Sequence, residues 1–186
     1  IVEDGSLTRE LYDVLDEYES KYPKLIRRCR NEANLGLGMA LNKGLAACRN
    51  ELVARMDTDD ISKPNRCELQ LKRFEEKPEL SIVGAHIDEF AGNVGNVVST
   101  RKVPLANEEI YAFGKRRNPF NHMSVMYRKK AVLAENGYAS GAMRCEDIDL
   151  FGRMLFHGCR AENVDKSLVW VRFGEDALAR RTGWED

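Results

Sequence analysis

Three carboxylates stand close together in the segment Asp57-Thr58-Asp59-Asp60. The apolar run at residues 51–56 precedes them and predicts a buried strand. Ligands of open α/β sheets bind just beyond the carboxyl ends of strands, and an extended backbone would turn Asp57 and Asp59 to the same side. Carboxylates in one small volume repel each other unless a cation lies between them. Mg²⁺ and Mn²⁺ prefer such oxygen ligands, often together with substrate phosphates. The segment therefore predicts either a metal–diphosphate site or a polar, solvated turn.

A second acidic pair, Glu146-Asp147, opens an apolar segment with helical spacing that includes Ile148, Leu150 and Phe151. Acidic residues in the first turn of a helix are stabilised by its macrodipole, so one interpretation is a well-stabilised helix start. The other interpretation is a general base that a rigid helix carries and that faces the acidic segment across a cleft.

These residues must be positioned by elements that the apolar spacing predicts. In the first half, strands are expected at residues 1–3, 25–26, 51–56 and 80–85, and helices at 7–18, 39–46 and 64–74, with Ser6 capping the first helix and Pro64 in the first turn of the third. In the second half, we expect a hairpin at 90–100, helices at 107–115 and 146–155, and strands at 124–127 and 167–173. Alternating strands and helices indicate an α/β fold with a parallel sheet in a single domain, residues 1–186.

Composition narrows the class of protein. The 29 basic and 30 acidic residues nearly cancel, so no overall charge favours nucleic acid or an anionic membrane. No stretch approaches the roughly eighteen apolar residues of a membrane span, and no signal peptide is evident. The five cysteines lack CxxC spacing and predict reduced, mostly buried thiols of a cytosolic protein. They are Cys29, Cys48, Cys67, Cys145 and Cys159.

Five motifs follow one another along the chain. They are Glu3-Asp4-Gly5-Ser6, Asn34-Leu35-Gly36 with Asn42-Lys43-Gly44, Asp57-Thr58-Asp59-Asp60, Asn118-Pro119-Phe120-Asn121-His122 and Glu146-Asp147-Ile148-Asp149-Leu150. In this order and spacing, the chain resembles the family 2 inverting glycosyltransferases over essentially its whole length. The resemblance implies an α/β fold of the glycosyltransferase A type, with a mostly parallel nucleotide-diphospho-sugar-binding sheet and helices on both faces. Residues 1–90 would bind the nucleotide sugar, and residues 91–186 would bind the acceptor.

The resemblance also implies a reaction. A sugar would move from a nucleoside-diphosphate sugar, expected to be a UDP-sugar, to a hydroxyl of a saccharide or lipid-linked acceptor in polysaccharide or glycolipid biosynthesis. By this likeness, the following residues would bind the nucleotide sugar: Glu3 and Asp4 near the base, with Gly5, Ser6, Asn34, Gly36, Asn42, Asp57 and Thr58. The enzyme would work in the cytoplasm, and at the inner face of the membrane if the acceptor is lipid-linked.

The remaining roles carried over by the resemblance concern the metal and the acceptor. Asp59 would bind Mn²⁺ or Mg²⁺ directly, and Asp57 would reach the ribose, or the metal through water. Asp60 would support them. Asp147 would be the base that deprotonates the acceptor hydroxyl. Glu146 and His122 would lie on the acceptor side.

Three departures from the family pattern are visible. The chain is expected to lack the first strand–helix unit of the family, as a truncated or partial sequence would. Leu41 stands where many members carry arginine. No histidine follows the last strand. Glu175, Asp176 or water would then complete the metal site, or Arg180 and Arg181 would meet the diphosphate instead, or the tail is only a flexible charged segment.

Other classes of protein compete with this interpretation. A non-catalytic nucleotide-sugar-binding module of the same fold would keep the acidic segment but not turn over. A sugar nucleotidyltransferase shares the sheet architecture but needs a glycine-rich, lysine-bearing phosphate loop, which residues 1–40 do not supply. A structural interaction protein would not need Asp57, Asp59 and Asp147 to approach one cleft.

Overall fold

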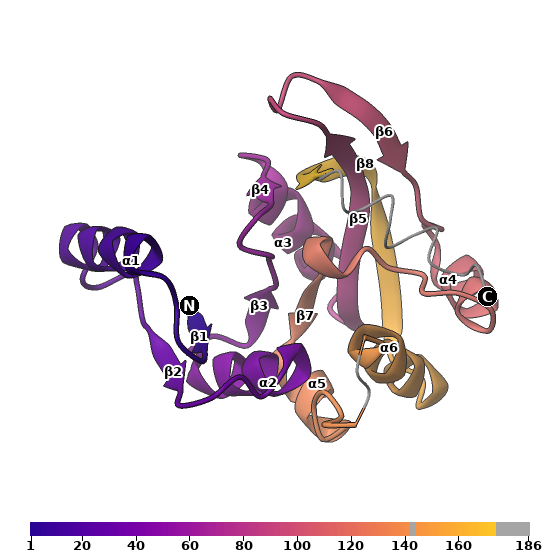
Figure 1. Ribbon diagram of the computed structural model, residues 1–186. Coiled ribbons are helices and arrows are strands. Elements are labelled where there is room, and N and C mark those ends of the chain that lie inside the picture. The colour runs from indigo at the N-terminus through magenta and orange to yellow at the C-terminus, as the bar shows by residue number, and fades with distance from the viewer. Residues whose placement is uncertain (142–143, 174–186) are drawn as a thin grey trace, which may run out of the picture.

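The computed structural model describes residues 1–141 and 144–173, which form a two-stranded sheet, a six-stranded sheet and the helices packed against them (Figure 1). In chain order the elements are β1 (Val2–Asp4), α1 (Arg9–Lys21), β2 (Cys29–Asn31), α2 (Leu37–Ala47), β3 (Leu52–Ala54), β4 (Ile61–Ser62), α3 (Arg66–Glu76), β5 (Leu80–Phe90), β6 (Val97–Arg101), α4 (Asn107–Gly114), the 3₁₀ turn η1 (His122–Ser124), β7 (Met126–Arg128), α5 (Lys129–Ala134), α6 (Glu146–Phe156) and β8 (Arg160–Arg172).

The large sheet is mixed, so the prediction of a mostly parallel sheet is wrong. Its strands lie in the order β3-β7-β5-β8-β4, with β6 also paired to β5. Within the described part of the chain, β5 and β8 make its only parallel pair, while β3–β7, β4–β8, β5–β6 and β5–β7 are antiparallel. A parallel pair needs a long crossover, whereas a strand that returns through a tight turn is antiparallel. The hairpin predicted at residues 90–100 is confirmed, and it is one source of the difference, because β6 returns directly along β5.

Helices cover both faces of the large sheet, as expected. Side chains alternate between the two faces of a strand, and neighbouring residues of β5 accordingly enter two different cores. Ile82 packs in the larger core with Phe151 of α6 and Ile110 of α4. Val83 packs in the smaller core with Phe74 of α3. Both β5 residues are fully buried, so the sheet is anchored from two sides.

Several predicted boundaries moved. The first helix starts at Arg9 with Thr8 as its N-cap, not Ser6, and α3 starts at Arg66 with Asn65 as its N-cap, so Pro64 precedes the helix. The strand expected at residues 25–26 lies at β2 instead, because β1 pairs in parallel with Cys29–Asn31. The amides of residues 25 and 26 instead bond back to the carbonyl of Tyr22 as a turn.

The expectation of mostly buried cysteines is also wrong. All five are free thiols; Cys67 and Cys145 are exposed, and the other three are partly exposed. Cys67 follows the buried Arg66 on α3 and faces solvent on the next position of the helix, while Cys145 is the N-cap of α6. Among the described residues, no helix is long and apolar enough to cross a membrane.

A buried polar frame joins α3 to the strands. The side-chain amide of Gln70 donates to the carbonyls of Val83 on β5 (2.7 Å) and of Ser124 in η1 (2.8 Å), and its oxygen accepts from Arg66 Nε (3.1 Å). Arg66 Nη2 in turn donates to the carbonyls of Arg55 (2.6 Å) and Val125 (3.1 Å). Arg66 and Gln70 are both almost completely buried. The frame therefore fixes the backbone of residue 55, two residues before the acidic segment.

Replacing Gln70 with leucine should destabilise the fold by about 2–4 kcal/mol, because it removes the partner of the buried Arg66 Nε and the hydrogen bonds to two buried carbonyls. Chemical denaturation of both proteins measures the difference in the free energy of unfolding. Lys72→Ala, on the exposed face of the same helix, is the matched control and should change stability by about 0.5 kcal/mol or less. A Gln70→Leu loss no larger than that of the control would show that the frame does not hold the fold.

Candidate active site

The acidic segment follows β3 and forms a turn rather than an extended strand. The amide of Asp60 approaches the carbonyl of Asp57 at 3.4 Å, with Thr58 and Asp59 at the turn. The expectation that Asp57 and Asp59 share one side of an extended backbone is therefore wrong. The chain turns here because β3 and β4 lie at opposite ends of the strand order and run in opposite directions. The preceding strand β3 is partly exposed rather than buried, since it pairs only with β7.

Arg55 occupies the base of this segment. Its side chain is 4% exposed and pairs with the Asp57 carboxylate through both terminal nitrogens, with Nη1 at 2.7 Å from Oδ2. A buried cation needs such a partner. Asp57 is therefore partly neutralised by protein, whereas Asp59 is exposed to solvent.

Asp60 is the electrostatically strained member of the segment. Burial, together with the negative charges of Asp59 and Asp57, raises its pKa to about 6. The hydrogen bond that its Oδ1 accepts from the amide of Arg172 on β8 (3.1 Å) opposes this rise. Burial and the two neighbouring carboxylates thus disfavour the ionised form of Asp60 more than Arg55 and the hydrogen bond favour it. The segment therefore favours the approach of a cation.

The motif at residues 3–6 is mostly occupied in holding the fold. Asp4 accepts hydrogen bonds from the Asn31 side chain (2.8 Å) and from the amides of Leu35 (3.0 Å) and Gly36 (2.9 Å). Burial opposes ionisation of Asp4, but these hydrogen bonds outweigh it and lower its pKa. Gly5 has φ +95°, a backbone conformation that side chains rarely adopt.

Three other predicted nucleotide-sugar residues lie elsewhere. Glu3 is buried and forms an ion pair with Arg28 (2.6 Å). Ser6 lies in the connection between β1 and α1. The Asn42 side chain brackets the main chain of Tyr138, accepting from its amide (2.9 Å) and donating to its carbonyl (2.8 Å).

A cavity of about 700 Å³ brings part of the predicted site together. Its lining includes Asp4, Asn34, Arg55, Asp57 and Thr58, contributed by the end of β1 and by the segments that follow β2 and β3. Small-molecule sites commonly have this size and combine apolar walls with a few polar groups. Leu41, where the family pattern often has arginine, forms part of an apolar wall of this cavity. Gly36 and Glu146 line a separate groove of about 280 Å³.

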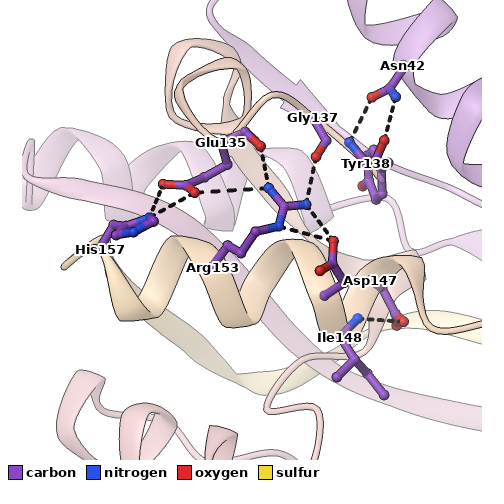
Figure 2. A network of polar contacts seen from close by, with 9 residues as sticks. Asn42, Glu135, Gly137, Tyr138, Asp147, Ile148, Arg153 and His157 are labelled. Atoms are coloured by element: carbon purple, nitrogen blue, oxygen red, sulfur yellow. Dashed lines mark hydrogen bonds and ion pairs between the residues drawn. The ribbon is translucent and has the colours of Figure 1, made fainter. Parts of the chain in front are cut away.

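Asp147 lies in the first turn of α6 and is partly exposed (Figure 2). Its Oδ2 accepts from the Asn118 side chain (2.6 Å), and its Oδ1 accepts from the amide of Ile148 (2.8 Å). His122 Nδ1 lies 4.0 Å from the same Oδ2. The carboxylate is thus oriented from two sides and still reaches solvent, as a general base must.

His122 is buried and neutral at physiological pH. Burial, together with the positive charge of Arg55, lowers its pKa to about 3. Its Nε2 lies 3.0 Å from the Tyr138 hydroxyl. Arg55 and Asp147 also both act on the pKa of Tyr138, which burial raises. Arg55, which pairs with Asp57, and Asp147 therefore both act on Tyr138, although they come from different halves of the chain.

Sequence reasoning missed Arg55 and Tyr138. A basic residue two positions before an acidic motif is a signal that could have indicated Arg55, because a cation buried at a strand end needs a nearby carboxylate. No local pattern indicates Tyr138, whose contacts come from distant segments. Glu175, Asp176, Arg180 and Arg181 lie outside the described residues.

The donor set fits a hard divalent cation that shares its shell with a substrate. Within residues 1–141 and 144–173, no group of three or more His, Cys, Asp or Glu side chains is arranged to hold a metal by itself. Mg²⁺ is typically held by one or two carboxylates plus phosphate oxygens. Exposed Asp59 and the raised pKa of Asp60 are consistent with such a partial site.

The sequence is similar to known proteins over most of its length. The family model described as "Glycosyl transferase family 2" matches residues 1–137. The amylovoran biosynthesis glycosyltransferase AmsE of Erwinia amylovora is 38% identical over 184 residues, which cover 99% of this chain and 67% of that protein. The UDP-Gal:alpha-D-GlcNAc-diphosphoundecaprenol beta-1,3-galactosyltransferase of Escherichia coli is 36% identical over 183 residues, which cover 98% of this chain and 65% of that protein.

Among solved structures, GalNAc-T7 with UDP, GalNAc and Mn²⁺ superposes with a TM-score of 0.72 at 15% identity, over 95% of this chain and 38% of that chain. At this identity the likeness concerns the fold, which is of the glycosyltransferase A type. The chain spans about two thirds of the length of the two bacterial relatives. With a family match over residues 1–137 and relatives of such identity, this chain belongs to glycosyl transferase family 2.

Proposed function

We propose that this chain is the nucleotide-sugar-binding and catalytic part of an inverting glycosyltransferase of polysaccharide or glycolipid biosynthesis. The observation that carries the proposal is a link between two acidic sites through Arg55 and His122. The first site, Asp57–Asp60, reaches the 700 Å³ cavity at Asp57 and Thr58, and its Asp57 is paired with Arg55. The second site, Asp147, is oriented by Asn118 and lies 4.0 Å from His122, on which the Arg55 charge also acts. Transfer of a sugar needs one site for the leaving diphosphate and another for the attacking hydroxyl.

The cavity is the proposed place of the donor. Its walls are apolar at Leu41 and polar at Asp4, Asn34 and Asp57, which suits a nucleoside. The name of the Escherichia coli relative specifies a UDP-sugar, and the solved neighbour contains UDP. We therefore propose a UDP-sugar as the donor.

Asp59, with support from Asp60 and Asp57, is the proposed holder of Mn²⁺ or Mg²⁺. When bound, such a cation stabilises the negative charge that develops on the departing diphosphate. Asp57 has less freedom for this role than Asp59, because Arg55 already engages it.

Asp147 is the proposed general base. It takes the proton of the acceptor hydroxyl while the acceptor oxygen bonds to the anomeric carbon. The bond between that carbon and the diphosphate oxygen breaks, and the diphosphate leaves with the electron pair. Attack opposite the leaving group inverts the anomeric centre, which requires the base and the diphosphate to stand on opposite faces of the sugar. Glu146, on the adjacent groove, is proposed to lie on the acceptor side.

The acceptor is proposed to be a saccharide on a lipid carrier. The Escherichia coli relative acts, by its name, on a diphosphoundecaprenol-linked sugar. Such an acceptor would bring this chain to the cytoplasmic face of the membrane.

Replacing Asp147 with asparagine should lower turnover by about 100- to 10,000-fold while leaving donor binding intact, because the amide cannot accept the proton. Release of UDP in the presence of Mn²⁺ and acceptor measures turnover, and calorimetry measures donor binding. The same substitution at Asp165, which is 76% exposed and pairs with His86, is the control. Unchanged turnover in Asp147→Asn would remove this residue from the mechanism.

Replacing Asp59 with asparagine should abolish the dependence of donor binding on Mn²⁺. A ligand at one hundred times its Kd stabilises the folded state by about 2.7 kcal/mol, so the wild-type chain should melt at a higher temperature with UDP-sugar and Mn²⁺ than with either alone. Asp59→Asn should lose this joint effect, whereas Glu68→Gln, an exposed acid on α3, should retain it. An equal shift in Asp59→Asn would place the cation elsewhere.

Ionisation of Asp60 should destabilise the metal-free fold. Its pKa of about 6 lies above the ordinary 3.8, so the folded chain holds an extra proton between about pH 4 and pH 6, and the free energy of unfolding falls as pH rises through this range. Asp60→Asn should therefore raise the melting temperature at pH 7 and change it little at pH 4, measured without divalent cations. A variant less stable than wild type at pH 7 only would contradict this sign.

A further inference from the structure

The turn that follows α5 is held from both sides by side chains that the proposed reaction does not use. Arg153 of α6 donates from Nη2 to the carbonyl of Gly137 (2.8 Å) and from Nη1 to the carbonyl of Glu135. Its guanidinium is itself oriented by Asp149 (2.6 Å). Figure 2 shows Arg153 rising from α6 to reach these two carbonyls. From α2, Asn42 makes the pair of hydrogen bonds to the main chain of Tyr138 described above (Figure 2).

The conformation of this turn leaves little freedom. Asn136 and Gly137 have φ values of 60° and 71°, in the left-handed region that favours glycine. A Cβ atom added at Gly137 would lie 2.4 Å from Asn42 Oδ1. The close approach of Asn42 therefore depends on glycine at this position, and the main chain of Tyr138 is fixed relative to both α2 and α6.

Because its main chain is fixed, Tyr138 places its side chain against His122 in the proposed active site. It is 2% exposed, its hydroxyl lies 3.0 Å from His122 Nε2, and it also shares a hydrogen bond with the side chain of Tyr127. The other ring nitrogen, His122 Nδ1, faces Asp147 Oδ2 at 4.0 Å. Since His122 is neutral, the position of its single ring proton decides what Asp147 faces.

The two possible tautomers differ in electrostatics. A neutral imidazole has one N–H and one lone pair. If Nδ1 held the lone pair, two electron-rich groups would face each other in a largely buried site. If Nδ1 carries the proton, the N–H dipole favours the ionised carboxylate, and Nε2 can accept from the Tyr138 hydroxyl. Tyr138 can then accept from the Tyr127 hydroxyl, so both tyrosine hydroxyls donate a hydrogen bond.

We propose that Tyr138 is a positioning residue whose hydroxyl donates to His122 Nε2 and thereby fixes the imidazole with its proton on Nδ1, facing Asp147. The catalytic consequence rests on the proposed function of Asp147, but the tautomer itself does not. Tyr138 acts only through His122. Arg153 and Asn42 hold Tyr138 in the place that makes this possible.

The tautomer is measured directly by NMR on the whole chain labelled with ¹⁵N-histidine. The chain has only three histidines, at 86, 122 and 157, and a His122→Gln variant assigns the signals. At pH 7 the wild-type chain should show His122 protonated on Nδ1. The Tyr138→Phe variant should lose this single tautomer and show a mixture or protonation on Nε2. Protonation on Nε2 in the wild type, or an unchanged Nδ1 signal in Tyr138→Phe, would overturn the proposal.

Tyr127→Phe is the matched control for this measurement. It removes a buried hydroxyl that bonds to the same Tyr138 but does not contact His122, so it should keep the Nδ1 tautomer at a similar cost in stability. If Tyr138→Phe does not fold, the wild-type spectrum still decides which nitrogen carries the proton.

Kinetics then separate this proposal from the proposed function. Tyr138→Phe should lower kcat by about fivefold to tenfold, the rate equivalent of one neutral hydrogen bond, and leave the KM for the UDP-sugar unchanged. A change in KM alone would contradict a positioning role. A wild-type chain that shows the expected tautomer but transfers no sugar from any nucleotide donor would instead disprove the proposed function.

Discussion

The buried guanidinium of Arg55 is the charge on which the arrangement of the site depends. It offsets one carboxylate of the acidic segment and helps to keep His122 neutral. An unpaired buried cation would strongly destabilise the fold, so Arg55 and its carboxylate partner must keep their relative positions. Arg55 thereby couples the end of β3 to residues that arrive from the second half of the chain. The carbonyl of the same residue is held by Arg66 of α3, which makes the coupling rigid.

The site combines firmly held groups with groups left available. The side chains of Asp4, Glu3 and Asn42 are bonded to other parts of the protein and stabilise the fold. Asp59 faces solvent, and Asp147 keeps part of its carboxylate open. A catalytic side chain needs this arrangement, because it keeps its productive position only when neighbouring side chains hold it there. Asn118 and His122 are those neighbours for Asp147.

Local patterns predicted those parts of the molecule that are determined locally. The helix beginning at Glu146 and the hairpin after Phe90 were predicted because apolar spacing and turn residues specify them. The directions of neighbouring strands were not predictable, because the alternation of strands and helices does not specify which strands become neighbours or whether they run parallel. The prediction that the cysteines are buried was wrong for a related reason. Which side of a helix is buried depends on the elements that pack against it, so Cys67 is exposed while the adjacent Arg66 is buried. Tyr138 escaped notice because its contacts come from α2 and η1, far away in sequence.

The interleaved sheet has a consequence for how this enzyme family diversifies. β8, near the end of the described chain, pairs with both β4 and β5, and β7 joins β3 to β5. Neither half of the chain can be exchanged for that of a relative without rebuilding these registers. We therefore expect new substrate preferences to arise by changes in loops, such as the loop between β5 and β6 or the segment before α6, while the sheet pairings stay the same.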